Sequence, residues 1–252
     1  MDLGLRERVY VITGGSRGLG RATAQALVAD GARVVISSRS KDGVAAAVTG
    51  LGAANAVGLA ADNSSPDAPQ QLVAAAMESF GRLDGALISV GGPPGGSVAD
   101  ISDEQWRASF ESVFLGAVRM AVAFGAALGD GGSIVFVLST SVRAPLESLA
   151  ISNGLRPGLA GIAKSLADDL GPRGIRVNGL MPGRVATDRV IELDARIGDP
   201  DAVRAQLSQR IPLRRYAAPE EFGRVAAFVL SPAAAYVSGA MIPVDGGSLR
   251  GF

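Results

Sequence analysis

The sequence predicts an α/β protein with a doubly wound, parallel sheet of seven strands and helices on both faces. Short apolar runs rich in β-branched residues alternate with longer amphipathic stretches along the chain, and turn residues separate them. The 252 residues contain no linker, internal repeat or low-complexity tract. Repeated strand–helix–strand units with right-handed crossovers build a parallel sheet, so we expect a single domain over residues 1–252.

The first strand, a glycine loop and a helix are predicted for residues 8–30. Residues 9–12 (VYVI) have the apolar, β-branched character of a buried parallel strand. A helix follows from about Gly18, and Gly14, Gly18 and Gly20 are spaced GxxxGxG across the turn. Because side chains are absent there, N–H groups at the helix start can approach an anionic group closely, which predicts a phosphate-binding loop. A tight turn that binds nothing is the alternative.

The other elements follow in order along the chain. Strands are expected at residues 33–37, 56–61, 83–90, 133–139, 175–180 and 240–244. Helices are expected at residues 44–48, 66–80, within 102–128, at 153–170 and at about 219–230. In such a sheet a ligand binds beyond the carboxyl ends of the strands, which is the edge that the glycine loop occupies.

The composition limits the classes of function. Lys and Arg number 24 and Asp and Glu number 24, so the zero net charge suggests neither nucleic acid nor an anionic membrane as a partner. The absence of cysteine and histidine argues against disulfides, histidine triads and thiolate or imidazole metal sites, and we expect no metal. No signal peptide is predicted in residues 1–10. The uncharged run 225–244 contains two prolines and predicts helix, turn and strand. We expect a cytoplasmic protein.

The ends of the second and third strands suggest a dinucleotide. An acidic residue that would bind a ribose 2′-hydroxyl is missing from Ser37-Ser38-Arg39. Arg39 and Arg17 can instead pair with a 2′-phosphate, which favours NADP over NAD, although both arginines can equally face solvent. Asp62 and Asn63 are predicted to contact the adenine edge or, alternatively, to form a turn.

Five segments carry a resemblance to a known family over nearly the whole chain. They are residues 13–20 (TGGSRGLG), Asp62, and residues 176–188 (RVNGLMPGRVATD), 219–232 (PEEFGRVAAFVLSP) and 236–247 (YVSGAMIPVDGG). The sequence resembles the short-chain dehydrogenases/reductases, most closely their 3-oxoacyl-ACP reductase branch. The resemblance implies a Rossmann-type domain, a nicotinamide dinucleotide, a small-molecule substrate, and a homotetramer built from the fifth and sixth helices and the last strand. With the strand-end residues above, it gives a cofactor set of Gly14, Ser16, Arg17, Gly18, Leu19, Gly20, Arg39, Asp62, Asn63, Gly91, Pro182, Gly183, Val185 and Thr187.

The catalytic positions of that family are mostly altered in this sequence. Its members carry a Ser after the fifth strand and, thirteen residues later, Tyr-x-x-x-Lys. Ser139 fills the first position, but Ser152 and Arg156 stand where Tyr and Lys are expected, and Val113 replaces an Asn in the long helix. The family's Asn-Asn-Ala-Gly becomes residues 88–91 (ISVG). Ser139, Ser152 and Arg156 are therefore the catalytic candidates.

These substitutions leave the proton donor unidentified. A serine hydroxyl is a far weaker acid than a phenol and arginine stays protonated, so neither can replace the Tyr directly. Glu147 would be an acid if it were desolvated, although an exposed loop glutamate is the commoner case. Arg143 can stabilise an oxyanion or bind a substrate carboxylate, or lie solvated at the surface.

Two functions of different classes remain. One is an NADP(H)-dependent oxidoreductase for a carbonyl or alcohol, in which Ser139 and Ser152 hold the substrate oxygen and Arg156 positions the nicotinamide ribose. The other is a dinucleotide-binding sensor or structural partner of an active paralogue, without reductase activity. Different chemistry on the same scaffold, such as dehydration, is a third possibility.

Three further segments have both a functional and a structural interpretation. Residues 184–215 suit a substrate lid or a mobile surface loop, and residues 91–96 (GGPPGG) suit a cover over the nicotinamide or a simple turn. Trp106 is expected in the core or at an interface. A subunit interface, or alternatively a ligand groove, is expected on the small-residue face formed by Gly154, Gly158, Gly161 and Ala163.

Overall fold

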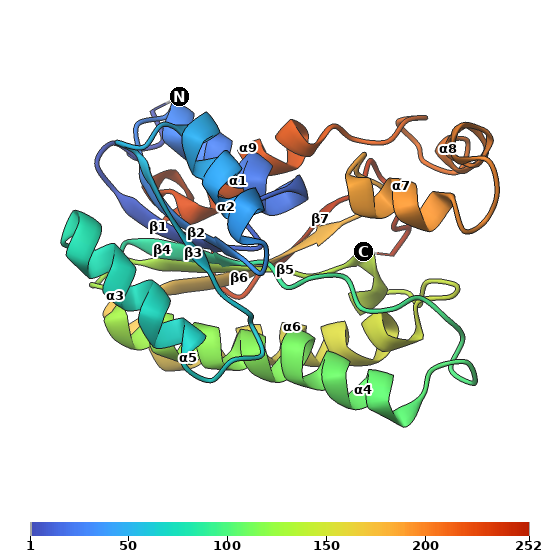
Figure 1. Cartoon of the computed structure of the whole chain (residues 1–252), viewed down its shortest axis with the longest axis horizontal. Helices are drawn as coiled ribbons and strands as arrows, with labels where there is room; N and C mark the ends of the chain where they lie inside the picture. The colour runs from blue at the N-terminus through green and yellow to red at the C-terminus, as the bar shows by residue number, and fades with distance from the viewer. Residues whose placement is uncertain (1, 252) are drawn as a thin grey trace.

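The computed structural model describes residues 2–251, and its seven strands form one parallel sheet (Figure 1). The strand order is β3-β2-β1-β4-β5-β6-β7, and each strand runs parallel to its neighbours. The order reverses beside β1, as the sequence predicts for a doubly wound sheet. The strands are β1 (Val9–Thr13), β2 (Arg33–Ser38), β3 (Ala56–Ala60), β4 (Gly85–Ile88), β5 (Ser133–Val137), β6 (Arg176–Pro182) and β7 (Met241–Val244).

Helices cover both faces of the sheet because successive residues of each strand point to opposite sides. In β1, Val9 and Val11 join the core cluster of Leu72 and Phe124, whereas Tyr10 and Ile12 join the cluster of Leu27 and Phe222. The predicted α/β class is therefore confirmed. One face is covered by α1 (Gly18–Ala29), α2 (Lys41–Leu51) and α9 (Pro219–Leu230), and the other by α3 (Ala68–Phe80), α5 (Gly116–Ala127) and α6 (Ala150–Leu170), as Figure 1 shows.

The helix predicted within residues 102–128 is interrupted. It consists of α4 (Asp103–Ser109), a π-helical turn η1 (Phe110–Leu115) and α5. A capping box between Ser102 and Gln105 starts α4. The run Asp103–Ala127 has the length and hydropathy of a membrane span, yet it is a core helix here, with Met120 and Phe124 fully buried.

Two other regions differ from the prediction. The helix expected at 44–48 is the longer α2, which begins after Ser40, whose hydroxyl accepts from the N–H of Gly43. The expected lid contains two helices, α7 (Asp188–Asp194) and α8 (Pro200–Ser208), which its polar sequence did not predict. The uncharged run 225–244 forms the end of α9, the turn η4 (Pro232–Ala234) and β7, as predicted.

Candidate active site at the carboxyl edge of the sheet

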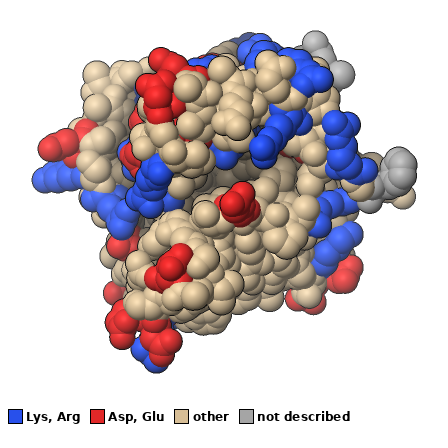
Figure 2. Space-filling model, turned by 90° about the vertical axis from the view of Figure 1, so that its right-hand side faces the viewer, with Lys and Arg blue, Asp and Glu red and all other residues tan. Residues whose placement is uncertain are grey.

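The predicted site residues come together at one end of the molecule. The strands are parallel, so the loops that follow β1 to β6 all leave the sheet at the same edge. Figure 2 faces this end and shows a hollow with Lys and Arg side chains on both sides of it. Figure 2 also shows an acidic side chain at the lower rim, so the cations lie at the sides of the hollow, where they can meet the charged groups of an anionic ligand.

The glycine loop after β1 has the geometry of a phosphate-binding loop. Gly14 and Gly18 have φ angles of +62° and +56°, which L-residues with side chains rarely adopt. A Cβ on Gly20 would lie 2.4 Å from the carbonyl oxygen of Gly14, so only glycine allows this close turn. Arg17, the N-cap of α1, makes no capping bond with its side chain. The first N–H groups of α1 therefore have no side-chain acceptor within residues 2–251, and an anion can take that place.

The neighbouring residues of the loop lie where they can support it. Ser16 is half-buried and lies beside Gly43 of α2, and Leu19 packs on the cluster beneath α1. Thr13 ties the loop to the end of β4: its hydroxyl donates to the carbonyl oxygen of Ser89 at 2.9 Å and accepts from the N–H of Ser89 at 2.8 Å. This reciprocal pair keeps the ends of β1 and β4 in register.

Arg39 and Asp62 are neighbours at the ends of β2 and β3. Ser64 donates to one oxygen of Asp62 through its N–H and its hydroxyl, at 2.9 and 2.8 Å. These bonds, and then the charge of Arg39, lower the pKa of Asp62. Asp62 thus forms a turn, which the sequence also predicts as the alternative to contact with the adenine. Its other carboxylate oxygen accepts no hydrogen bond from residues 2–251. The main chain of Asn63 lies against Gly116: a Cβ on Gly116 would be 2.2 Å from the backbone carbonyl oxygen of Asn63.

The loop after β6 reaches back to the glycine loop. Pro182 ends β6, and the N–H of Gly183 donates to the carbonyl oxygen of Val244 at 3.0 Å. Val185 is buried and pairs with Ala217. A Cβ on Gly18 would lie 3.5 Å from the methyl group of Thr187, so the segment after β6 borders the glycine loop. Gly91, after β4, is exposed and has open space in front of it.

The catalytic candidates follow β5 and lie on α6. The Ser139 hydroxyl accepts from the N–H of Ser141 at 3.1 Å. The hydroxyl oxygens of Ser141 and Ser152 are 3.1 Å apart and form a buried hydrogen bond. Ser141 was not singled out from the sequence, although the run of three hydroxyl residues at 139–141 was a visible signal. The structure thus joins Ser139 and Ser152 through Ser141.

Arg156 lies one helical turn after Ser152 and is buried. Its Nη1 atom donates to the carbonyl oxygen of Val137, the last residue of β5. Burial lowers the pKa of Arg156 to about 10, so the guanidinium remains charged at neutral pH. The charge is thus held at the end of β5, and Ser139 follows two residues later in the chain.

Glu147 and the three tyrosines do not have the environment of a proton donor for this site. Glu147 is exposed, so the desolvation that would make it an acid is not present. Tyr10 is buried in the core beneath α1, the Tyr216 hydroxyl donates to Asp194, and Tyr236 is fully exposed. The loop that carries Glu147 is anchored by Asn153, whose side-chain amide makes two hydrogen bonds with the main chain of Leu146 at 3.0 and 2.8 Å.

Helix α7 of the expected lid crosses the hollow. Arg189 donates from Nη2 to the carbonyl oxygen of Pro93, in the loop 91–96, at 2.7 Å. Glu192 lies 4.0 Å from Arg17 of the glycine loop. The helix therefore contacts both walls of the site, and neither contact was evident from the sequence.

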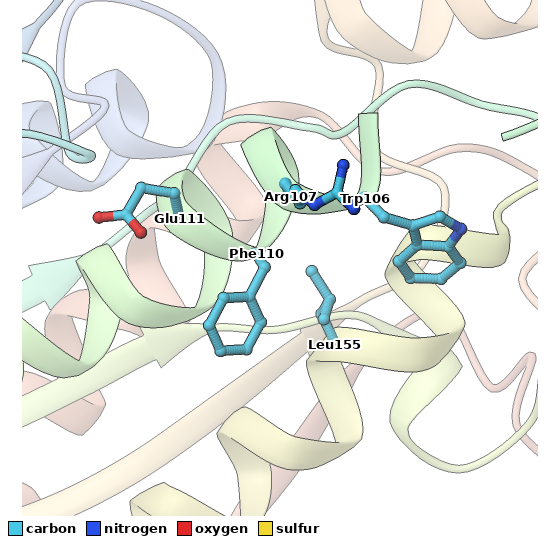
Figure 3. A pocket seen from close by; sticks show the side chains of 5 residues that line it. All are labelled: Trp106, Arg107, Phe110, Glu111 and Leu155. Carbon is cyan, nitrogen blue, oxygen red and sulfur yellow. The ribbon is translucent and has the colours of Figure 1, made fainter. Parts of the chain in front are cut away.

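A second hollow lies away from this edge, on the outer side of α4, η1 and α6 (Figure 3). It is lined by Trp106, Arg107, Phe110, Glu111 and Leu155. The small residues of α6 are partly explained by this arrangement, because a Cβ on Gly154 would lie 3.3 Å from the Trp106 ring and one on Gly158 2.8 Å from Phe114. The Phe110 and Phe114 rings stack at 5.2 Å. Gly161 has open space beside it.

Comparisons with known proteins agree with this geometry. The family model described as enoyl-(acyl carrier protein) reductase matches residues 14–248. An uncharacterized oxidoreductase of Methylorubrum extorquens is 35% identical, covering 96% of this chain and 98% of that protein. A 3-oxoacyl-[acyl-carrier-protein] reductase of Synechocystis is 31% identical over 96% of this chain and 97% of its own length. The crystal structure of L-sorbose reductase from Gluconobacter frateurii, complexed with NADPH and L-sorbose, has a TM-score of 0.92 and 29% identity, and the match covers 100% of both chains.

Proposed function

Because the chain belongs to the short-chain dehydrogenase/reductase family of NAD(P)-dependent oxidoreductases, we propose that it transfers hydride between NADP(H) and a carbonyl or alcohol substrate in the cytoplasm. The observation that carries the proposal is the uncapped start of α1. Its glycine turn lies at the same sheet edge as the Ser139, Ser152 and Arg156 side chains.

The residues present fit such a dinucleotide. The N–H groups at the start of α1 would hold its pyrophosphate, because only glycine permits the close approach at Gly20. Arg17 and Arg39 would pair with the 2′-phosphate, since a guanidinium matches phosphate oxygens with two parallel bonds. Asp62 keeps one carboxylate oxygen for the adenine, and Thr187 would face the phosphates. NAD remains the second choice of cofactor, and the bound nicotinamide supplies or accepts the hydride.

The chain's own groups bind and orient the substrate in this proposal. The hydroxyls of Ser139 and Ser152 hold the substrate oxygen, and Ser141 fixes Ser152 through the bond at 3.1 Å. Arg156 keeps a positive charge beside this oxygen and positions the nicotinamide ribose. Proton transfer falls to solvent or to a group on the substrate, because the tyrosines of residues 2–251 lie elsewhere. Loss of a general acid typically removes about 10²- to 10⁴-fold of rate, so we expect slow turnover.

The second candidate is a dinucleotide-binding sensor or structural partner without reductase activity. It is favoured by a different observation: Ser152 occupies the position expected of the acid, and its hydroxyl forms a hydrogen bond with another serine. Under this alternative the phosphate-binding loop keeps its role and Ser139 has none.

A homotetramer is proposed from two exposed apolar surfaces. Phe110 is 45% exposed beside the second hollow, in the turn η1 that connects α4 and α5 (Figure 3). Tyr236, just before the last strand, is fully exposed. Large exposed aromatic side chains favour protein contacts, and the family resemblance assigns the subunit interface to the fifth and sixth helices and the last strand. Light scattering after gel filtration measures the oligomeric state, and a monomer at micromolar concentration would refute this part.

The first experiment is a titration of the purified protein with NADPH and with NADH, followed by nucleotide fluorescence and thermal stability. We expect saturable binding with NADPH preferred. A screen of carbonyl substrates with bound NADPH then separates a slow enzyme from an inactive binding protein. A folded protein that binds neither nucleotide would reject both candidates.

A further inference from the structure

Arg156 is a buried cation without a carboxylate partner in the part of the chain that the structure describes. It is 6% exposed, and the ion pairs of residues 2–251 do not include it. Burying an unpaired charge is unfavourable, so a buried arginine either pairs with an anion or lowers the stability of the protein. A residue kept in this state therefore points to a counter-charge that the chain does not supply.

The guanidinium has donors left for that counter-charge. Its Nη1 atom donates to the carbonyl oxygen of Val137, and its other nitrogens form no hydrogen bond in residues 2–251. Within the same range, Ser37 Oγ is the only side-chain nitrogen or oxygen that is both buried from solvent and without a hydrogen-bond partner. The remaining nitrogens of Arg156 therefore reach the accessible surface instead of ending in the core.

Ser152 adds a second donor on the same helix face. It lies four residues before Arg156, is also 6% exposed, and shares one hydrogen bond with the hydroxyl of Ser141. The Ser141 hydroxyl lies 3.1 Å from the Ser152 hydroxyl and 3.4 Å from the Ser152 carbonyl oxygen. When the Ser141 proton takes the shorter of these two contacts, the Ser152 hydroxyl proton is free for another acceptor. A guanidinium and a hydroxyl on one helix face favour an anionic acceptor, and Glu147 of the loop before α6 is exposed.

The phosphates of a dinucleotide do not fill this role by contact. Val137 ends β5, whereas the phosphate-binding loop follows β1, and β4 lies between these two strands. Strands spaced about 4.8 Å apart put the two sites on the order of 10 Å from each other. Ribose hydroxyls are neutral, so they can take a hydrogen bond from Arg156 but leave its charge unmatched.

We propose that Arg156 and Ser152 bind a carboxylate on the substrate, so that the enzyme acts on an oxo acid or the corresponding hydroxy acid. The planar guanidinium matches the two oxygens of a carboxylate, which is why the proposal names this anion. The proposal rests on the proposed function in placing the reacting oxygen at Ser139, and it reassigns Ser152 from that oxygen, and Arg156 from the nicotinamide ribose, to the carboxylate. The carboxylate site itself is independent of turnover.

The test compares matched pairs of probes that differ in charge alone. Acetoacetate is paired with acetoacetamide, and benzoylformate with benzoylformamide. Binding to the full chain is measured by calorimetry, with and without saturating NADPH. We expect each acid to bind at least about tenfold more tightly than its amide, a preference that weakens as salt is raised.

Variants assign this preference to Arg156. Arg156→Met is expected to abolish the preference for the acid. Arg6 is an exposed arginine near the N-terminus, and Arg6→Met is expected to leave the preference unchanged. If Arg156→Met does not fold, Arg156→Lys should keep part of the preference and Arg156→Gln should lose it. Equal binding of acid and amide, or a preference that survives Arg156→Gln, overturns the proposal.

The outcome separates this proposal from the proposed function. An acid preference that depends on Arg156, in a protein that does not bind NADPH, keeps the carboxylate site and rejects the oxidoreductase. NADPH binding with equal affinity for acid and amide keeps the oxidoreductase candidate and rejects the carboxylate site.

Discussion

The hydroxyl of Tyr216 donates to Asp194 at 2.9 Å, across the base of the segment 184–215. Asp194 also forms an ion pair with Arg184 and is only 2% exposed. Arg184 lies at the start of this segment and Tyr216 directly after it, so one buried carboxylate at the end of α7 holds both of its ends. We expect this contact to fix α7 over the hollow.

Asp194→Asn tests that contact. The change keeps the size of the side chain but leaves the half-buried Arg184 without its counter-charge, and we expect a loss of about 1–3 kcal/mol in the free energy of unfolding. Proteolysis within 184–215 should become faster. Asp201→Asn, an exposed aspartate of α8, is the matched control and should change stability by less than about 0.5 kcal/mol. Identical urea midpoints for the two variants would show that Asp194 does not hold the segment.

Gly20→Ala tests the phosphate-binding loop. The new methyl group would lie 2.4 Å from the Gly14 carbonyl oxygen, so the turn must open, at a cost of about 1–3 kcal/mol and with loss of NADPH binding. Gly171→Ala is the control, because it places the same methyl group in open space at an exposed residue with helical φ and ψ, and it should change stability by less than about 1 kcal/mol. Undiminished NADPH affinity in Gly20→Ala would contradict the assignment of the loop.

Arg39→Ala tests the choice of cofactor. Removing a guanidinium that pairs with the 2′-phosphate should weaken NADPH at least about tenfold and leave NADH unchanged, because NADH lacks that phosphate. Fluorescence titrations with both nucleotides measure this ratio, with Arg6→Ala as the exposed control. If both nucleotides weaken equally, Arg39 does not recognise the 2′-phosphate.

Glu221→Gln tests an electrostatic contact at the start of α9. Arg215 donates to the two oxygens of Glu221 at 2.6 and 2.7 Å, and these bonds, with the N–H of Ala218, lower the pKa of Glu221 from 4.5 to about 2. Because the folded state has the lower pKa, the carboxylate stabilises the fold above about pH 4.5, and this contribution is lost as the pH falls towards 2. Urea midpoints of the wild type and Glu221→Gln should differ at pH 6 and converge near pH 2. A difference that is constant with pH would refute the argument.

The triple change of Ser152→Tyr, Arg156→Lys and Val113→Asn tests whether the site is a reductase site that lacks its acid. Restoring a phenol should raise reduction of simple 3-oxoacyl or diketone substrates by about 10²- to 10⁴-fold. The double change of Arg156 and Val113 alone is the control for the acid. A triple variant that folds, binds NADPH and still gains no activity would refute the hypothesis that the site is a reductase site that lacks only its acid.

The sequence was informative where a pattern is local and repeated. Helix α9 occupies Pro219–Leu230, as predicted, because its apolar stripe is long and Pro219 marks its first turn. Helices α7 and α8 were missed because they are short and polar, and α8 depends on the single cap at Asp199.

The site divides in the same way. Residues at strand ends were predictable, since parallel strands bring their carboxyl ends to one edge. The contacts of Ser141 with Ser152, and of Asp194 with Tyr216, join residues 11 and 22 positions apart. Such contacts depend on how loops pack, which no local pattern in one sequence specifies.

The π-helical turn η1 sets the rotational phase between two halves of one long helix. It holds one residue more per turn than an α-helix, and each residue turns an α-helix by about 100°. Deleting one residue from Phe110–Leu115 would thus swing α4 by roughly that angle about the axis of α5. The Trp106 ring would then no longer pack against Gly154, so the length of this turn decides which side of α4 faces outward.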